Sequence, residues 1–310
     1  MNFRITFLIL FTIAIVSVIF STTMDVYISI YDPNWNGLFS KNIDDSDKKR
    51  IFLIGSSTVY SIDSSYINNK FSINEKNYEL YNLADMSDTP HKRLLSINNI
   101  ISNNPETIIY GIDVQNFNQK TPKYSTISEL ILHPKTIFND IFFDIIDTIK
   151  EKIPGSPKDR SLLTLKYILF GPQPHHHPFI NFAETPITPI NELKNYTDSE
   201  FYRLDLSKNN KQIIALQQIV NELKKNDIKV ILFSTPYAKI PVSQEDVEHF
   251  EKMLNDFSQE NNVPVYYLHE KYVLKEIWRD NIHVAVNNDT KIYSNDIFQI
   301  LLKELNNSAI

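Results

Sequence analysis

Two short segments of this chain carry the residue types that nucleophilic acyl transfer requires, although more than two hundred residues separate them. The first is Gly-Ser-Ser at 55–57, directly after an apolar run. The second is Asp-Asn-Ile-His at 280–283, which places a carboxylate three residues before an imidazole. A serine hydroxyl is a poor nucleophile until a histidine takes its proton, and a carboxylate fixes the tautomer of that histidine. Ser57, His283 and Asp280 are therefore candidates for a catalytic triad.

Each segment also has a simpler structural interpretation. Ser57 stands between a strand-like run and a helix-compatible stretch, where its hydroxyl would be exposed and helix amides would be available to an oxyanion. A helix cap or a turn serine is the alternative at that position. His283 alone is typical of a satisfied surface or core residue, and Asp280 could cap the segment that follows it. The triad hypothesis depends on the order and spacing of the two segments together.

The rest of the sequence predicts the elements that would position these residues. Short apolar runs that suit buried strands alternate with stretches of helical periodicity. The strand candidates are 51–54, 78–83, 107–111, 229–234 and 263–268, and the helix candidates are 90–103, 211–226, 244–261 and 291–306. This alternation predicts an α/β fold with a parallel sheet that is covered on both faces. In such sheets ligands bind at the carboxyl ends of the strands, where both Ser57 and Asp113 fall.

Glycine usage supports this placement. Two of the five glycines, Gly55 and Gly111, directly follow predicted strands. A glycine at such a point permits a sharp turn or a close approach of the backbone to a ligand.

Composition places the chain among globular proteins and excludes several kinds of chemistry. Of its 310 residues, 42% are apolar and 12% aromatic, which suits one sizeable core and a smaller appended subdomain. A net charge of −6 without a long basic run argues against a nucleic-acid partner. The absence of cysteine excludes disulfides, thiolate catalysis and cysteine-ligated metals, without deciding the compartment.

The amino-terminal segment predicts a membrane anchor. Residues 5–20 form an almost unbroken apolar run after Arg4, and no lysine or arginine follows until Lys41. This asymmetry favours an amino terminus inside and the rest of the chain outside the cytoplasm, as a single-pass protein of the cell membrane. We expect an anchor or signal segment over 1–24 and a stalk over 25–50. A cleaved signal peptide and a buried core helix are the alternatives.

Residues 51–310 are predicted to form the α/β domain, with a proline-containing insertion at about 117–206. Long insertions at the carboxyl edge of a sheet usually shape the substrate site, so we interpret this one as a cap, with a purely structural layer as the alternative. It contains three adjacent histidines, His175 to His177. Three interpretations of them stay open: a metal site, a contact between the cap and the active site, or a solvated loop. Tyr237, after the fourth strand candidate, could line the pocket or belong to a plain turn.

The first and last segments resemble blocks of the SGNH, or GDSL-like, superfamily of hydrolases and acyltransferases, in the form of a membrane-anchored member. The first block of that superfamily has the form Gly-Asp-Ser after a strand, and 55–57 matches it with serine in the middle place. The last block has the form Asp-x-x-His, which 280–283 matches. The resemblance implies Ser57 as nucleophile, His283 as general base and acid, and Asp280 as the orienting carboxylate. It also implies a flavodoxin-like three-layer α/β/α fold with five parallel strands.

The middle blocks of the superfamily supply the hydrogen-bond donors to the oxyanion. The counterpart of the second block places Ser87 where the superfamily has a glycine, and the backbone N–H survives that change. The third block has the form Gly-x-Asn-Asp, and Asp113 is nearest to its asparagine. An ionised Asp113 accepts hydrogen bonds only and would repel an oxyanion. Three alternatives remain open: Asp113 is protonated, Asn116 or Gln115 supplies the donor, or catalysis is weak or absent.

The resemblance implies an extracytoplasmic serine esterase or O-acyltransferase. Single-anchored members of the superfamily commonly act on ester-linked acyl groups of cell-surface carbohydrate, through an acyl-enzyme. The expected partners are therefore such an acylated carbohydrate or another ester, and a membrane through residues 5–20. No metal ion, organic cofactor or nucleic acid is implied. The rival interpretations are a catalytically inactive surface protein of the same fold that binds glycan or an envelope partner, and an assembly scaffold in an envelope complex.

Overall fold

The computed structural model describes residues 4, 11–12, 48–84, 88–119 and 184–306. The chain divides into two compact units, and nearly all described residues belong to the second, Ser46–Thr121 with His175–Ile310. Of the first unit, Met1–Asp45 with Pro122–Pro174, only residues 4, 11 and 12 are described, each in helical conformation. None of the described helices is both long and apolar enough to cross a membrane. Of the predicted anchor, 1–24, only residues 4, 11 and 12 are described, and of the predicted stalk, 25–50, only residues 48–50 are described.

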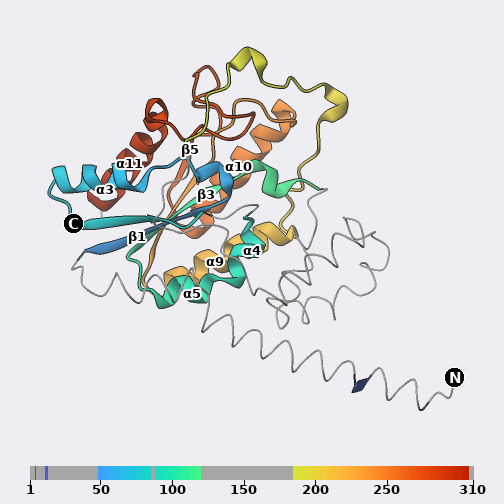
Figure 1. The fold of residues 1–310 in the computed structure, drawn as a ribbon. Helices are drawn as coiled ribbons and strands as arrows, with labels where there is room; N and C mark the ends of the chain where they lie inside the picture. Colours follow the sequence, from blue (N-terminus) through green and yellow to red (C-terminus); the bar gives the residue numbers. More distant parts are fainter. Residues whose placement is uncertain (1–3, 5–10, 13–47, 85–87, 120–183, 307–310) are drawn as a thin grey trace. The chain divides into compact units, whose positions relative to one another are not determined.

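The second unit is built on a five-stranded sheet in which neighbouring strands are parallel, which confirms that prediction (Figure 1). The strands are β1 (Lys49–Gly55), β2 (Tyr78–Asn82), β3 (Thr107–Ile112), β4 (Lys229–Ser234) and β5 (Val265–Tyr267). Their order is β2-β1-β3-β4-β5, the flavodoxin-like order, in which the direction of the connections reverses between β1 and β3. Folds of this kind bind ligands in the crevice at the carboxyl ends of these two strands.

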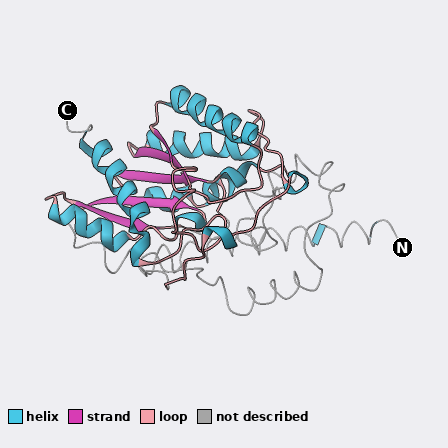
Figure 2. Ribbon diagram, turned by 90° about the horizontal axis from the view of Figure 1, so that it is seen from above, coloured by secondary structure: helices cyan, strands magenta, loops and turns pink. Residues whose placement is uncertain are grey.

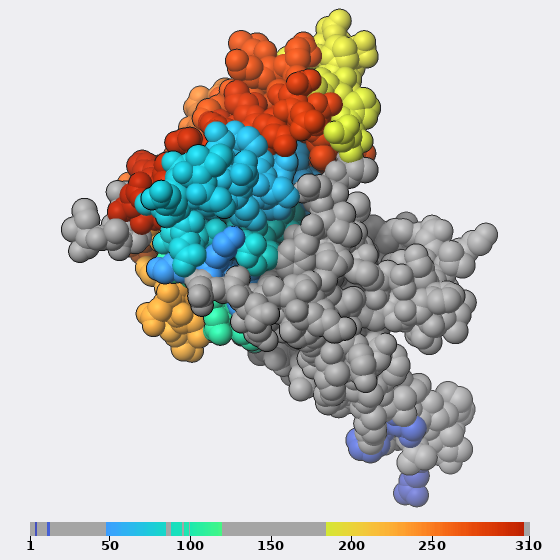
Figure 3. Space-filling view, turned by 60° about the vertical axis from the view of Figure 1, so that its left-hand side comes forward, coloured from blue at the N-terminus to red at the C-terminus, as the bar shows by residue number. Residues whose placement is uncertain are grey.

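Helices cover both faces of the sheet (Figures 1 and 2). On one face α3 (Ser64–Ile73) packs against α11 (Lys291–Asn306), and their surfaces adjoin in the space-filling view (Figure 3). On the other face α4 (Pro90–Leu95) and α5 (Ile97–Ser102) pack against α9 (Lys211–Lys225). The helix α10 (Gln244–Asn261) lies beside α9, because the side-chain amides of Asn261 and Gln217 are hydrogen-bonded at 2.9 Å. The arrangement has the three layers that a buried parallel sheet requires.

The core forms where apolar strands meet the apolar stripes of the helices. The four central residues of β1, from Ile51 to Ile54, are fully buried. The helix α3 contributes Ile67 and Phe71, which are four residues apart and therefore lie on one face of the helix. Phe71 packs edge-on against Phe298 of α11, with ring centroids 5.4 Å apart. Burying these side chains supplies most of the stabilisation that fixes the carboxyl edge of the sheet in place.

Three elements differ from the sequence-based predictions. The helix predicted at 90–103 is divided at Ser96, whose hydroxyl and amide both donate to the Arg93 carbonyl, so α4 ends there and α5 begins. The fifth strand is shorter than 263–268 because the amide of Leu268 donates to the Ser234 hydroxyl rather than to a strand carbonyl. The helix α3 is not among the predicted helices, since its only buried positions are two among many polar residues.

Candidate active site

The first strand ends in a turn that only glycine accommodates. Gly55 has φ +151°, and a Cβ atom on it would lie 3.0 Å from the Gly111 carbonyl oxygen. A Cβ atom on Gly111, its register partner on β3, would lie 2.7 Å from Val59 Cγ1 and 2.9 Å from Phe233 Cζ. The two glycines thus let the chain after β1 fold back tightly into the 3₁₀ turn η1 (Ser57–Val59). Ser57 is the first residue of that turn, at the carboxyl edge of the sheet.

The hydroxyl of Ser57 meets the imidazole of His283. Its Oγ atom lies 2.8 Å from His283 Nε2. The His283 side chain is 25% exposed, so solvent and a small substrate can reach this pair. Geometry of this kind allows the imidazole to take the hydroxyl proton as the oxygen attacks.

Asp280 completes the hydrogen-bond chain. Its carboxylate oxygens lie 2.8 Å and 2.9 Å from His283 Nδ1, and Oδ1 also accepts the backbone amides of Ile282 and His283. Burial opposes ionisation of Asp280, but the hydrogen bonds from the His283 ring and the Ile282 amide outweigh it and lower its pKa to about 2. An ionised carboxylate at Nδ1 requires the proton to sit on that nitrogen, which leaves Nε2 free to accept the Ser57 proton.

The loop that carries Asp280 and His283 is held from two sides. A bridge between Trp278 and Val284 closes its base. The described end of the predicted insertion lies against it, because Thr188 Oγ1 donates to the Arg279 carbonyl at 2.7 Å and the Asn281 side chain donates to the Lys194 carbonyl at 2.7 Å. This part of the insertion therefore supports the histidine loop, whereas residues 120–183, including His175, lie outside the described residues.

Potential donors to an oxyanion gather at the same edge. The backbone amide of Ser57 has no hydrogen-bond acceptor within the described part of the chain, whereas the amide of Thr58 donates to Ser56 Oγ at 3.4 Å. Asn116 is 7% exposed, and its side-chain amide makes no hydrogen bond to the described residues. Ser87 lies outside the described residues. The amide of Ser57 is therefore the donor best placed by the described geometry.

Asp113 occupies the position that matches Ser57 on the neighbouring strand. Gly55 and Gly111 are paired in register, and each is followed two residues later by one of these side chains. The Asp113 carboxyl is buried; Oδ1 accepts the Gln115 amide at 2.9 Å, and Oδ2 lies 3.5 Å from Ser56 Oγ. Burial raises the pKa of Asp113, although the Gln115 amide, His283 and Ser56 act against that rise.

Three tyrosines interact electrostatically with this carboxyl. Of the three, only Tyr237 is a candidate from the sequence. The hydroxyls of Tyr202, Tyr237 and Tyr293 are buried and have no hydrogen-bond partner among the described residues. Burial raises the pKa of each, and the charge of Asp113 adds to that rise. No local sequence pattern marks Tyr202 or Tyr293, because both approach Asp113 only through tertiary packing.

A second serine–histidine pair joins the carboxyl ends of β4 and β5, because Ser234 is the last residue of β4 and His269 follows β5 by two residues. Ser234 Oγ is 2.8 Å from His269 Nδ1, and His269 Nε2 is 3.0 Å from Glu251. Ser234 is fully buried, and its hydroxyl also accepts the Leu268 amide at 2.9 Å. A hydroxyl that is inaccessible and already bonded to the backbone cannot attack a substrate, so this pair fastens β5 to β4.

Other features of the described residues lie away from the triad. No group of three or more histidine, aspartate or glutamate side chains in the described ranges is arranged to hold a metal ion.

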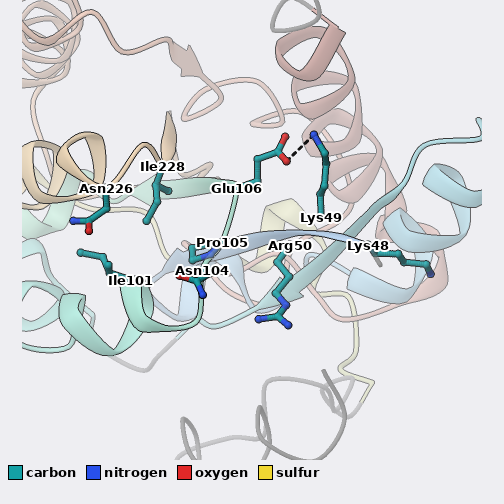
Figure 4. Close-up of a pocket in the computed structure, with 9 residues that line it drawn as sticks. All are labelled: Lys48, Lys49, Arg50, Ile101, Asn104, Pro105, Glu106, Asn226 and Ile228. Carbon is teal, nitrogen blue, oxygen red and sulfur yellow. Dashed lines mark ion pairs between the residues drawn. The ribbon is translucent and has the colours of Figure 1, made fainter. Parts of the chain in front are cut away.

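A pocket of about 420 Å³ opens at the amino ends of the strands, on the edge opposite to Ser57. Figure 4 shows the residues that line it. Lys49 and Glu106 form an ion pair of 2.9 Å there, and Arg50 donates to the Asn103 carbonyl. This pocket contains no nucleophile paired with a base.

Comparisons with known proteins found distant structural likenesses. No family model and no curated protein matches the sequence. The esterase EstA from Pseudoalteromonas sp. is 9% identical, with a TM-score of 0.45 over 84% of this chain and 100% of that chain. Axe2, an acetyl-xylooligosaccharide esterase from Geobacillus, is 10% identical, with a TM-score of 0.42 over 83% and 95%. AlinE4, an SGNH-hydrolase family esterase, is 10% identical, with a TM-score of 0.38 over 84% and 97%.

Proposed function

We propose that this chain is a serine esterase or O-acyltransferase of the SGNH type. The observation that carries the proposal is the continuous hydrogen-bond chain from Ser57 through His283 to Asp280 at the carboxyl edge of a parallel sheet. Each of the three side chains lies within hydrogen-bond distance of the next, which is the arrangement that nucleophilic acyl transfer requires.

The chemistry follows from this geometry. His283 Nε2 takes the Ser57 proton as Oγ forms a bond to the ester carbonyl carbon, and negative charge develops on the carbonyl oxygen. The Ser57 amide donates to that oxygen. The ester C–O bond then breaks, and His283 returns the proton to the leaving alcohol, which leaves an acyl group on Ser57. Water, or the hydroxyl of an acceptor, attacks the acyl group in the same way and restores the serine.

The location and the substrate class are further parts of this proposal. The apolar run at 5–20 supports an anchor that holds the α/β domain outside the cytoplasm. The resemblance of the first and last blocks to single-anchored SGNH members supports acylated cell-surface carbohydrate as the substrate. Proteolysis of intact cells and of spheroplasts, followed by detection of the α/β domain, tests the location: protection in spheroplasts contradicts an extracytoplasmic domain.

The second candidate function is a catalytically inactive protein that uses the same edge to bind glycan or an envelope partner. The observation that favours it is Asp113, because an ionised carboxylate beside the nucleophile would repel the oxyanion. A binding protein would retain glycan affinity in the Ser57→Ala variant and would hydrolyse no ester.

Hydrolysis of p-nitrophenyl acetate by the full chain in detergent distinguishes the two functions. The esterase proposal predicts turnover that Ser57→Ala abolishes. Ser61→Ala is the matched control, since it removes a buried serine hydroxyl that has no hydrogen-bond partner among the described residues. Turnover retained by Ser57→Ala, or no turnover by the folded wild type, contradicts the proposal. Production of an acylated sugar when an acceptor is added indicates transfer rather than hydrolysis.

A further inference from the structure

The Asp113 carboxyl receives fewer hydrogen bonds from the described residues than a buried carboxylate needs. The side chain is buried and has one short hydrogen bond, from the Gln115 amide to Oδ1. Its other oxygen has only Ser56 Oγ at 3.5 Å, and that hydroxyl already has Thr58 Oγ1 at 2.8 Å. A buried ionised carboxylate is normally stabilised by several donors or by a cation. Among the described residues Asp113 has neither, so its surroundings oppose ionisation.

The titratable side chains that interact with Asp113 among the described residues include no permanent positive charge that would stabilise its carboxylate. They are His283 from the triad loop, Tyr293 from α11, Tyr237 from the loop after β4, and Tyr202 before α9. None of them is a lysine or an arginine. The three tyrosine hydroxyls make no hydrogen bond to the carboxyl. Protonation of His283 is therefore the one event among these groups that would stabilise the ionised form of Asp113.

We propose that Asp113 acts as a neutral carboxylic acid whose Oδ2–H donates a hydrogen bond to the oxyanion formed at Ser57. The inference rests on the proposed esterase or acyltransferase function. Gly55 and Gly111 are register partners, so Ser57 and Asp113 each follow a neighbouring strand by two residues at the same edge of the sheet. Oδ2 of Asp113 makes only the 3.5 Å contact with Ser56 Oγ, the residue before the nucleophile, within the described part of the chain. No bond is made or broken at Asp113: its proton stays on Oδ2 and only stabilises the developing charge.

A donor of this kind makes activity dependent on two protonation states. His283 must be neutral to accept the Ser57 proton, and Asp113 must be protonated to donate. Raising the pH ionises Asp113, which then repels the oxyanion it had stabilised. The pH profile of kcat/KM is therefore bell-shaped. Activity requires loss of the proton from His283 and retention of the proton on Asp113, so kcat/KM falls again at alkaline pH instead of reaching a plateau.

Asp113→Asn and Asp113→Ala test the inference. Asparagine keeps the hydrogen bond to the Gln115 amide, because it caps a helical turn as well as aspartate does, and its amide donates at every pH. We expect Asp113→Asn to lose the alkaline fall and to exceed wild-type kcat/KM by about 10-fold or more near pH 8. Asp113→Ala removes the donor and should lower kcat/KM by about 10²–10³-fold at the wild-type optimum.

The outcomes separate this inference from the proposed function. A wild-type profile that stays flat at alkaline pH, or an Asp113→Asn variant that is less active than wild type at every pH, overturns the neutral-acid role. The wild-type profile provides this test even where a variant fails to fold. If Ser57→Ala keeps the esterase activity, the proposed function fails instead. If activity depends on Ser57 but the Asp113 variants behave like wild type, only the inference about Asp113 fails.

Discussion

The hydroxyl of Ser57 lies 2.8 Å from the Nε2 atom of His283, although 226 residues separate them along the chain. Ser57 is positioned by the glycine turn after β1, and His283 by a loop that the Trp278–Val284 bridge closes. Two separately anchored elements thus hold the nucleophile and the base together. Such preorganisation lowers the barrier to the chemical step, because the groups need not be ordered during the reaction.

Replacing Asp280 by asparagine tests the orienting role of its carboxylate. The amide cannot hold a proton on His283 Nδ1 by the same pair of short hydrogen bonds, so Nε2 is no longer reserved as the acceptor. We expect kcat to fall by about 10²–10⁴-fold with little change in KM. Steady-state kinetics with a chromogenic ester measure the effect. Asp256→Asn, an exposed position on α10, is the control, and an equal loss there contradicts the assignment.

The same carboxylate should make stability pH-dependent at the acid end. The pKa of Asp280 is lowered in the folded protein to about 2 from its ordinary value of 3.8. Its contribution to stability is therefore present above the unfolded pKa and lost as the pH falls through the folded pKa. The difference in denaturation midpoint between wild type and Asp280→Asn should shrink as the pH is lowered from about 6 towards 3. A difference that stays constant over this range contradicts the prediction.

The buried His269 should make the protein less stable in mild acid. Burial lowers the pKa of this imidazole, so below its ordinary value of 6.5 the unfolded chain binds the proton more readily than the folded chain. We expect Tm to fall between about pH 8 and pH 5 more steeply for wild type than for His269→Gln. His249→Gln, at an exposed position on α10, should keep the wild-type slope. Equal slopes for wild type and His269→Gln would show that His269 does not control this response.

A side chain at Gly111 should destabilise the fold, and its overlap with Val59 should account for the largest part of the loss. A Cβ atom at Gly111 would lie 2.7 Å from Val59 Cγ1, so Gly111→Ala forces buried atoms apart and is expected to lower the free energy of unfolding by about 1–3 kcal/mol. Chemical denaturation measures this loss. In a Val59→Ala background the same change should be less damaging, because the nearest contact has gone. Purely additive losses would contradict the overlap as the cause.

Much of the fold could be predicted from the sequence because the strands are uninterrupted apolar runs. The parallel direction of the strands then follows from the alternation with helices, whereas their flavodoxin-like order is implied only by the family resemblance. Periodicity does not reveal the helix α3, because its core face consists of Ile67 and Phe71 among polar residues. Periodicity also does not reveal the break at Ser96, because the break depends on one serine that is hydrogen-bonded back to the Arg93 carbonyl.

The candidate site could be predicted only in part, for a related reason. Ser57, Asp280 and His283 carry local patterns that indicate chemistry. Tyr202 and Tyr293 carry none, since they reach Asp113 only through tertiary packing. The protonation state of Asp113 could not be derived from sequence either, because it depends on burial and on how many donors surround the carboxyl.

Active-site labelling with a fluorophosphonate, read by intact mass, shows whether Ser57 is an activated nucleophile. The reagent forms a stable bond only with a serine that a base has activated. We expect one adduct on the full-length wild type, no adduct on folded Ser57→Ala or His283→Ala, and an undiminished adduct on Ser234→Ala. An adduct that persists in Ser57→Ala, or a folded wild-type protein that takes none, would contradict the claim that Ser57 is the activated nucleophile.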